Sequence, residues 1–359
     1  MIGRTHSTVA LLILAFIVMA YTTGQAGAVR IVKVTGETYE SEKITKKLDV
    51  DNIKRIVFAA TANFFGSVTI KSAAKNYQMT YIQHFKARSM EEAENFSEYI
   101  SVDSERSGDR LLITARGKRN APWQGTNQSA RAKIELVLPD SIEIEVNTIF
   151  FDITISGPFT KAEVVNEFGK IKISDITETL KLEAKNSRVS LDDIRGAIDV
   201  RTSNNQLCAR NIDTGDNEAE FWNEYGVIEI SKFSGVLKCG TSSQSIDLRG
   251  IRLKPGRSEI STKFGSIDAE IIKLENAELS ISDNFSNVEL TLPDDIQAEF
   301  DLRVDRGGRI RVSGIPIIPV EMKYERLRAQ TDNPESKIKV DISGIGTINV
   351  KGKKYLGVP

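Results

Sequence analysis

Apolar residues recur through the middle of the chain at every second position, in short runs that follow a small turn residue. Gly169, Gly226 and Gly265 each open such a run, for example Gly-Lys-Ile-Lys-Ile at the first of them. A spacing of two is typical of β-strands, because successive side chains of a strand point to opposite faces. The pattern therefore predicts short strands rather than helices in this region.

Eight copies of this pattern align when each is anchored on its first apolar residue, and neighbouring anchors are 18 or 21 residues apart. The anchors are Ile153, Ile171, Val189, Leu207, Ile228, Ile246, Ile267 and Val288. A second apolar residue stands two positions after every anchor, and an apolar residue or Cys239 stands seven positions before it. Columns of this regularity indicate a structural repeat.

A unit of 18–21 residues cannot bury its own apolar face, so successive units must stack on one another. We therefore expect an all-β fold, namely a parallel β-solenoid or β-helix in which each column becomes a ladder with about 4.8 Å between rungs. The sequence leaves the handedness of the solenoid open.

Two further columns complete each predicted rung. Three positions before the anchors the residues are Phe150, Phe168, Asn186, Asn204, Tyr225, Ser243, Phe264 and Phe285. Five positions after the anchors they are Ile176, Ile194, Ile212, Phe233, Ile251 and Ile272, with Pro158 and Pro293 at the two ends. We expect Phe, Asn and Ile to stack on their own kind along the axis.

Irregular sequence on both sides of the eight copies is expected to cap the stack, because open ends would expose unpaired strand edges. On the N-terminal side, Ser89 and Glu92 form a capping box that opens a short helix ending near Tyr99. Two segments in the same region, Leu111–Ala115 and Ala132–Leu138, alternate as strands.

Degenerate copies of the repeat begin at Phe65, Gly308 and Gly346, with their upstream apolar residues shifted by one position. They extend the repeat beyond the eight regular rungs on both sides. The expected organisation is a signal peptide at 1–28, an N-terminal β-rich cap region at 29–141, eight regular solenoid rungs at 142–292, and a C-terminal region of degenerate rungs and cap at 293–359.

The first 28 residues have the features of an export signal. Arg4 precedes an apolar stretch of 12 residues from Val9 to Ala20, and Ala26-Gly-Ala28 matches the small-x-small pattern of a cleavage site. Twelve apolar residues rise only about 18 Å as a helix, less than the roughly 30 Å of a bilayer core. We predict cleavage near Ala28 and an exported mature chain without a membrane span, in the periplasm, at the cell surface or secreted. An uncleaved anchor helix is the alternative.

The repeated Gly/Ser/Asn-x-Ile-x-Ile rungs, the Leu-Pro-Asp segments at Leu138 and Leu292, and the export signal resemble the bacterial "putative adhesin" domain family of unknown function. They are also similar to the auto-transporter-adhesin head-like domains of bacterial envelope proteins. The resemblance covers residues 50–352. It implies a β-solenoid outside the cytoplasmic membrane, and it brings no catalytic motif with it.

Composition excludes several classes of function. The 48 Lys and Arg residues balance 49 Asp and Glu residues, whereas a nucleic-acid-binding protein normally has a basic excess. After loss of His6 with the signal peptide, His84 is the only histidine. Ser-His-Asp hydrolysis and sites with several histidine ligands therefore lack the residues they need. We predict no catalytic residue and no cofactor.

One outward column is a candidate metal site. This column holds the residue that follows each anchor, between the two apolar positions of the second strand. In the last four rungs that residue is acidic: Glu229, Asp247, Asp268 and Glu289. Stacked like charges are unfavourable, so we expect compensation, either by a divalent cation such as Ca²⁺ with oxygen ligands or by a basic patch on a partner. The alternative is a solvated face that Arg249 and nearby lysines screen.

Trp222 is a candidate ligand-binding residue. The register points it outward beside an inward Phe221, with Glu220 and Glu224 nearby. Exposed aromatic side chains stack on sugar rings, and neighbouring carboxylates bind sugar hydroxyls. In the alternative interpretation, Trp222 packs under the longer rung that leads to it.

The two cysteines test the register. Cys239 falls in an inward column and Cys208 in an outward one, two rungs apart. Their Cα atoms should exceed the separation of about 7 Å that a disulfide allows. We therefore predict two free thiols.

Two functions remain. The first is a non-enzymatic exported envelope or surface protein that uses a rigid β-solenoid as an adhesion, binding or structural element, with a cell-surface or envelope glycan or protein as partner. The second is a carbohydrate-active β-helix enzyme similar to polysaccharide lyases, or a glycan-binding module. Asp247, Asp268 and Arg249 have the residue types that a lyase needs. Rung lengths differ by only three residues, which leaves little sequence to wall a groove.

Overall fold

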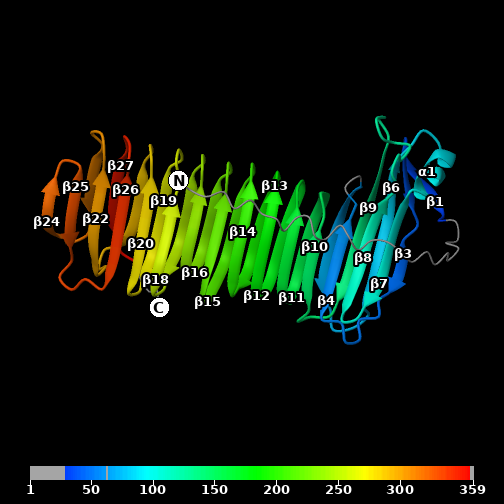
Figure 1. Ribbon diagram of the computed structural model, residues 1–359, viewed down its shortest axis with the longest axis horizontal. Coiled ribbons are helices and arrows are strands. Elements are labelled where there is room, and N and C mark those ends of the chain that lie inside the picture. Colours follow the sequence, from blue (N-terminus) through cyan, green and yellow to red (C-terminus); the bar gives the residue numbers. More distant parts are fainter. Residues whose placement is uncertain (1–28, 62–63, 356–359) are drawn as a thin grey trace.

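The computed structural model describes residues 29–61 and 64–355, so the predicted signal peptide at 1–28 lies outside the described residues. Within those ranges the chain forms 27 strands and one short helix, which confirms the predicted all-β class. The strands lie side by side in one long row, and the helix lies at one end of it (Figure 1).

The N-terminal part contains the helix and nine strands. They are β1 (Ile31–Thr35), β2 (Thr38–Ser41), β3 (Ile44–Lys47), β4 (Arg55–Ala60), β5 (Phe65–Ser72), β6 (Gln78–Lys86), α1 (Met90–Ser97), β7 (Ile100–Ser107), β8 (Arg110–Gly117) and β9 (Ser129–Leu138). Strands β8 and β9 include the two segments predicted from alternation, and β5 includes the degenerate copy at Phe65.

The central part contains twelve strands. They are β10 (Glu143–Asn147), β11 (Phe150–Asn166), β12 (Gly169–Lys185), β13 (Ser187–Arg195), β14 (Ala197–Ser203), β15 (Leu207–Asn223), β16 (Ile228–Thr241), β17 (Ile246–Leu253), β18 (Gly256–Ser261), β19 (Ile267–Leu274), β20 (Ala277–Asp283) and β21 (Val288–Pro293).

The C-terminal part contains six strands. They are β22 (Ala298–Val304), β23 (Arg309–Ser313), β24 (Ile318–Lys323), β25 (Arg326–Gln330), β26 (Ser336–Ile342) and β27 (Thr347–Lys353).

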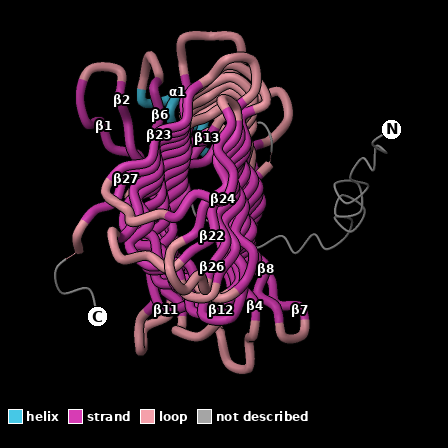
Figure 2. Tube along the Cα trace, turned by 90° about the vertical axis from the view of Figure 1, so that its left-hand side faces the viewer, coloured by secondary structure: helices cyan, strands magenta, loops and turns pink. Residues whose placement is uncertain are grey.

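Each anchor lies beside the anchor of the next rung in a parallel ladder. Ile153 pairs with Ile171, which pairs with Val189, and the same register continues to Val288. The segments upstream of the anchors form a second parallel ladder. Figure 2 looks along the stack, where strands of successive rungs lie behind one another. We call the two ladders the anchor ladder and the upstream ladder; their apolar side chains form one buried core.

The column five positions after the anchors needs three corrections. In the rung of β11 the buried residue is Phe159 rather than Pro158, in the rung of β19 it is Ile271 rather than Ile272, and in the rung of β21 it is Leu292 rather than Pro293. Several rungs turn this corner through one residue with positive φ, such as Asn211 at 53°. The number of corner residues differs at these three rungs, which shifts the register there.

The rungs at both ends are not stacked in chain order, which nothing in the repeat pattern indicates. Strands β4 and β5 lie between the rung of β10 and β11 and the rung of β8 and β9. Likewise, β26 and β27 lie between the rung of β20 and β21 and the rung of β22 and β23. Ile348 and Val350 of β27 are buried, whereas Ile310 and Val312 of β23 are only half-buried. The strand in the inner position is thus the more deeply buried one, although both strands carry the same Ile-x-Val pair.

The degenerate copies also differ in the spacing between the anchor and the upstream apolar residue of the same rung. In the copy at Gly346 the upstream partner stands eight positions before the anchor, since Ile348 pairs with Val288 and Val340 pairs with Ile281. This confirms the predicted shift by one. In the copy at Phe65 the shift is three, because Phe58 rather than a later residue pairs with Val146. A longer stretch of sequence between β4 and β5 accounts for it.

Antiparallel strands cover three of the outermost parallel strands. Strand β7 pairs with β8, β6 pairs with β9, and β25 pairs with β22, all antiparallel. They occupy backbone N–H and C=O groups that would otherwise invite another chain to pair. This pairing supports the capping role expected for the flanking sequence.

Helix α1 begins as the capping box predicts. The Ser89 hydroxyl accepts a hydrogen bond from the backbone N–H of Glu92 at 3.1 Å. The Glu92 carboxylate accepts one from the backbone N–H of Arg88 at 2.6 Å, one residue earlier than a standard capping box. At eight residues, α1 is too short to cross a bilayer, and no other described segment is a helix long and apolar enough to do so.

A column of buried polar side chains fixes the turn that leads into each anchor strand. Its members stand five positions before the anchors, and most are Thr or Asn: Thr148, Asn166, Thr202, Asn223, Thr241 and Thr262. The Asn223 amide donates to the carbonyl oxygens of Asn205 at 2.6 Å and Val227 at 3.2 Å. Because these carbonyls belong to neighbouring rungs, one side chain holds two turns in register.

Replacing Asn223 with Ala should lower the free energy of unfolding by about 1–3 kcal/mol, the usual cost of leaving buried polar groups without partners. Chemical denaturation followed by circular dichroism measures this change. Ser243→Ala, at the turn of the next rung and without a hydrogen bond of its own side chain among the described residues, should change it by less than about 0.5 kcal/mol. Equal midpoints for both variants would contradict the assigned role of Asn223.

Candidate functional site: a polar depression on the anchor face

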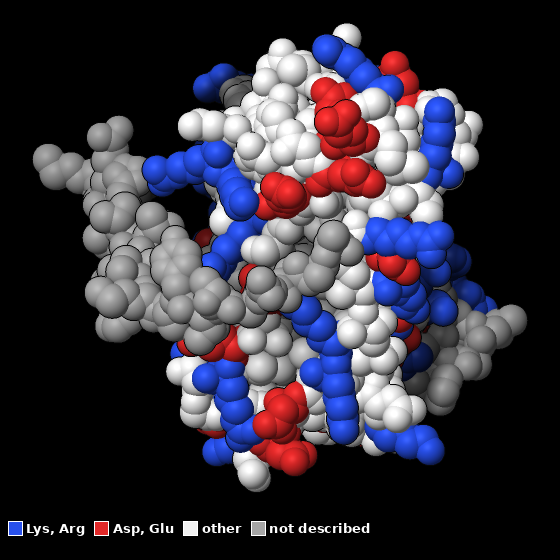
Figure 3. All heavy atoms as spheres, turned by 90° about the vertical axis from the view of Figure 1, so that its right-hand side faces the viewer, with Lys and Arg blue, Asp and Glu red and all other residues white. Residues whose placement is uncertain are grey.

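The outward face of the upstream ladder is covered by ion pairs between neighbouring side chains. Arg201 contacts Glu220 at 2.9 Å, and Arg257 contacts Glu259 at 2.8 Å. Acidic and basic side chains are similarly interspersed on the end of the stack that carries α1 (Figure 3). Charged groups that neutralise one another in this way are poorly placed to select a ligand.

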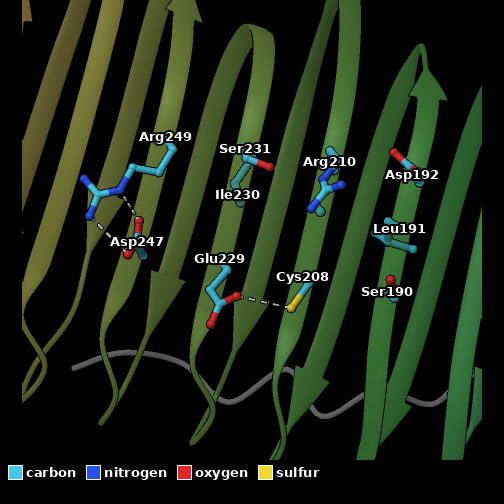
Figure 4. A pocket seen from close by; sticks show the side chains of 11 residues that line it. Ser190, Leu191, Asp192, Cys208, Arg210, Glu229, Ile230, Ser231, Asp247 and Arg249 are labelled. Atoms are coloured by element: carbon cyan, nitrogen blue, oxygen red, sulfur yellow. Dashed lines mark hydrogen bonds and ion pairs between the residues drawn. The ribbon is translucent and has the colours of Figure 1, made fainter.

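The outward face of the anchor ladder, which we call the anchor face, is hollowed instead. A depression of about 450 Å³ lies across β13, β15, β16 and β17 (Figure 4). Short side chains line it at Ser190, Cys208 and Ser231, beside the longer Arg210 and Arg249. The hollow exists because neighbouring rungs carry short residues where others carry long ones.

A second depression of about 300 Å³ adjoins the first and shares Glu229 with it. Gln206, Tyr225 and Gln244 line this second hollow. Gln206 donates to one oxygen of Glu229 at 2.7 Å, and the Cys208 thiol lies 3.5 Å from the other. Together the two depressions follow the strand direction from Tyr225 to Arg210, with Glu229 between them.

Tyr225 differs from the other aromatic residues of its column. Phe65 stacks on Phe150 and Phe264 stacks on Phe285, with ring centroids 4.6 and 5.8 Å apart. Tyr225 is 52% exposed and has no aromatic partner among the residues that the structure describes. Its column neighbours are Asn204 and Ser243, so no ring of its own column stacks on it.

The four predicted acidic residues lie in consecutive rungs, but each has a protein partner. Arg249 contacts Asp247 at 2.9 Å and Asp268 at 2.6 Å. Lys351 contacts Glu289 at 3.1 Å, and Glu229 accepts a hydrogen bond from the side-chain amide of Gln206. Within residues 29–61 and 64–355, no three His, Cys, Asp or Glu residues are grouped to hold a metal ion. Arg249 and Lys351 thus screen three of the four carboxylates, and a Ca²⁺ site at these residues stays a prediction.

The pKa shifts of Asp247 and Asp268 agree with their sharing the guanidinium of Arg249. The hydrogen bond from Arg249 lowers the pKa of Asp268. Burial raises the pKa of Asp247, and the charges of Asp268 and Glu229 add to this, although Arg249 opposes it. The two carboxylates therefore share one cation unequally.

Trp222 lies on the other face of the stack. It points outward beside the buried Phe221, as predicted, between Arg201 and Gly240 in the upstream ladder. Its half-buried indole lies directly against Gly240, where any larger residue would clash with the ring. This contact is with the next rung, whereas the alternative interpretation placed Trp222 under the longer rung that leads to it. A ligand-binding role for Trp222 stays a prediction.

The cysteines are both free, which confirms the prediction. Cys239 is buried and Cys208 is outward, as the register requires. Burial raises the pKa of Cys208 to about 11, and the neighbouring Glu229 adds to the shift. Burial also raises the pKa of Cys239.

Tyr225, Gln206 and Arg210 are functional candidates that no sequence motif marks. A signal was present in the column that holds Phe150 and Phe285, because its aromatic run is interrupted around Tyr225 by Asn and Ser. The second part of the signal, a hollow made by short residues on adjacent rungs, becomes visible only once the register is known.

Comparisons with known proteins identify no family. The sequence matches no protein-family model and no curated protein. Solved structures that resemble the chain include a "putative lipid binding protein" of Parabacteroides distasonis, at 13% identity and a TM-score of 0.35, covering 86% of this chain and 96% of that one.

Two further similar structures are named as adhesins. One is a "putative adhesin" of Parabacteroides distasonis, at 12% identity and a TM-score of 0.30, covering 86% of this chain and 97% of the other. The second is a "putative adhesin" of Parabacteroides merdae, at 12% identity and a TM-score of 0.28, covering 89% and 98%. Likeness at this level decides neither family nor function.

Replacing Arg249 with Gln should destabilise the protein at pH 7 by up to about 1 kcal/mol, the range of exposed ion pairs. The folded-state pKa of Asp268 is lowered, so its contribution is present above the unfolded pKa of about 3.9 and disappears as pH falls through the lower folded value. The difference between wild type and variant in urea denaturation should therefore shrink at pH 3. Arg309→Gln is the control, because Arg309 is exposed and has no ion pair among the described residues. If Arg249→Gln lost the same unfolding free energy at pH 7 and pH 3, the ionisation of Asp268 would not be linked to stability.

Native-state alkylation tests the environment of the thiols. At pH 8, Cys208 should react with iodoacetamide about 100-fold more slowly than the same residue in urea, because the thiolate is the reactive form and an ordinary cysteine has a pKa of about 8.5. Glu229→Gln should accelerate the reaction, and Cys239 should react only on unfolding. Labelling of native Cys208 as fast as in urea would contradict a raised pKa of its thiol.

Proposed function

We propose that this chain is an exported, non-enzymatic surface or envelope protein whose stacked rungs form a rigid β-solenoid for binding a glycan. In this proposal residues 142–292 carry the binding face, 29–141 and 293–359 close the two ends, and the segment 1–28 directs export. The observation that carries the proposal is the pair of joined depressions between Tyr225 and Arg210 on the anchor face.

The side chains of these depressions suit a sugar chain. The exposed ring of Tyr225 offers a surface for the C–H groups of a sugar ring, because an aromatic face is electron-rich and apolar. Gln206 and Gln244 supply amide donors and acceptors, and Glu229 supplies a carboxylate acceptor for hydroxyl groups. Their positions are set by backbone ladders rather than by mobile loops, so little entropy is lost when a ligand orders them.

Shape and charge weigh against the lyase-like alternative. Both depressions lie on a strand face, with no loop from residue 250 onward among their lining residues to close over a reacting bond. A lyase-like site built from Asp247, Asp268 and Arg249 would need a free base, but the guanidinium of Arg249 is already engaged by both carboxylates. These contacts favour binding over catalysis.

A glycan array followed by isothermal titration calorimetry tests the binding proposal. We expect retention of at least one class of oligosaccharide, and Tyr225→Ala should weaken its binding by about tenfold or more, since truncation of an aromatic anchor residue costs over about 1 kcal/mol. Tyr324→Ala is the matched control, because Tyr324 is 75% exposed and follows β24, far from the depressions.

An activity assay on polygalacturonate and alginate separates binding from catalysis. The protein should give no increase in unsaturated-uronide absorbance. Turnover that is lost in Asp268→Asn would establish the lyase-like alternative and overturn the non-enzymatic proposal. Absence of any glycan binding would overturn it as well.

A further inference from the structure

We infer that the glycan bound on the anchor face is acidic, with carboxylate or sulfate groups that Arg188 and Arg210 recognise. This inference rests on the proposed glycan-binding function and specifies its ligand class. It starts from the charge distribution on the anchor face, which changes sign along the stack at the depressions.

Four cationic side chains lie on the rungs that lead up to the depressions from the N-terminal side. Lys170 and Lys172 lie on β12, Arg188 on β13 and Arg210 on β15. All four are exposed, and none has an ion pair within the described part of the chain. Arginines and lysines elsewhere on the molecule commonly face a carboxylate, as Arg249 does.

The nearby carboxylates do not neutralise this group. Asp152 accepts a hydrogen bond from the backbone N–H of Lys170 at 2.8 Å, and Asp192 accepts one from the Asn211 amide at 2.8 Å. Neither forms an ion pair with Arg188 or Arg210 within the described ranges. These rungs therefore present positive charge that a ligand is free to use.

Register places Arg188 and Arg210 on either side of the first depression. Arg210 lies between Asp192 and Ser231 in the anchor ladder, and Arg188 lies beside Gln206 one rung earlier. The two arginines are four positions apart along the strand direction, about 13 Å at the usual strand rise. Arg210 lines the first depression itself, and the charges of both arginines act on the Cys208 thiol.

This spacing fits a chain with repeated anionic groups better than a single small anion. A guanidinium presents a planar fork of donors that matches a carboxylate or sulfate, and two backbone positions about 13 Å apart along the strand suit successive anionic groups of one chain. Tyr225 lies six positions from Ser231, about 20 Å along the strand. An oligosaccharide of several units, lying along the strands, meets the aromatic ring at one end and the arginines at the other.

A flat anionic membrane fits these features less well. The depressions are hollow rather than protruding, and Tyr225 would be the single aromatic group beside them. The exposed phenylalanines lie along the turn edge of the stack and mostly cover one another's faces. A bilayer resting on that edge would leave Arg210 on the adjoining face out of reach.

Calorimetry with the mature chain and matched oligosaccharides tests the inference in a buffer of physiological salt. The ligands are oligogalacturonate, its carboxyl-reduced neutral counterpart, and a sulfated oligosaccharide of similar length. We expect acidic ligands to bind at least about tenfold more tightly than the neutral one, and Arg188→Gln/Arg210→Gln to remove that preference, since a charge-assisted hydrogen bond contributes about tenfold or more in affinity. The relative affinity of the two acidic ligands tells carboxylate from sulfate recognition.

Arg309→Gln is the matched control, because it removes one exposed arginine from the end strand β23 without touching the depressions. Equal binding of neutral and acidic ligands, with no effect of the double variant, would overturn the acidic ligand while leaving glycan binding intact. Binding of none of the ligands, with native circular dichroism, would overturn both. Binding of anionic vesicles through Arg188 and Arg210 without glycan binding would assign the patch to membranes and also overturn the inference.

Discussion

In-register hydrogen bonding between parallel strands is the constraint on which the rest of this structure depends. Because each backbone pairs with the same position of the next rung, a residue in one rung faces its equivalent in the next, from Ile153 through Ile171 to Val189. Apolar columns then fill the core, and polar columns cover the outside. The environment of each side chain is therefore set mainly by the equivalent side chains of the two neighbouring rungs.

The same alternation explains why the anchor face is polar. On each anchor strand the inward positions are fixed by packing, while the outward positions are free to vary from rung to rung. Short residues at Ser190 and Ser231 beside a long arginine at 210 make a hollow. The buried Asn223 holds the turn that presents Tyr225 at its rim. Core and site therefore come from one backbone arrangement.

Much of this architecture follows from the sequence, because a period-two pattern repeated at 18 or 21 residues leaves few ways to bury its apolar face. The strands, the anchor register, the capped helix and the free cysteines were all predictable. The order of the end rungs was not, because strands far apart in the chain carry the same Ile-x-Val pattern, as β23 and β27 do, and the pattern does not say which lies inside. The depressions were not predictable either, since a hollow depends on which outward side chains are short on adjacent rungs. The acidic column was visible in sequence, but the engagement of Arg249 by two carboxylates was not.

The most direct test is to locate a bound sugar chain on the protein surface. A crystal structure of the mature protein with a bound acidic oligosaccharide should show one sugar ring against Tyr225 and an anionic group at Arg210, with the chain running along the strands past Glu229. A ligand found instead on the upstream face, against Trp222, or along the edge of stacked phenylalanines would contradict it.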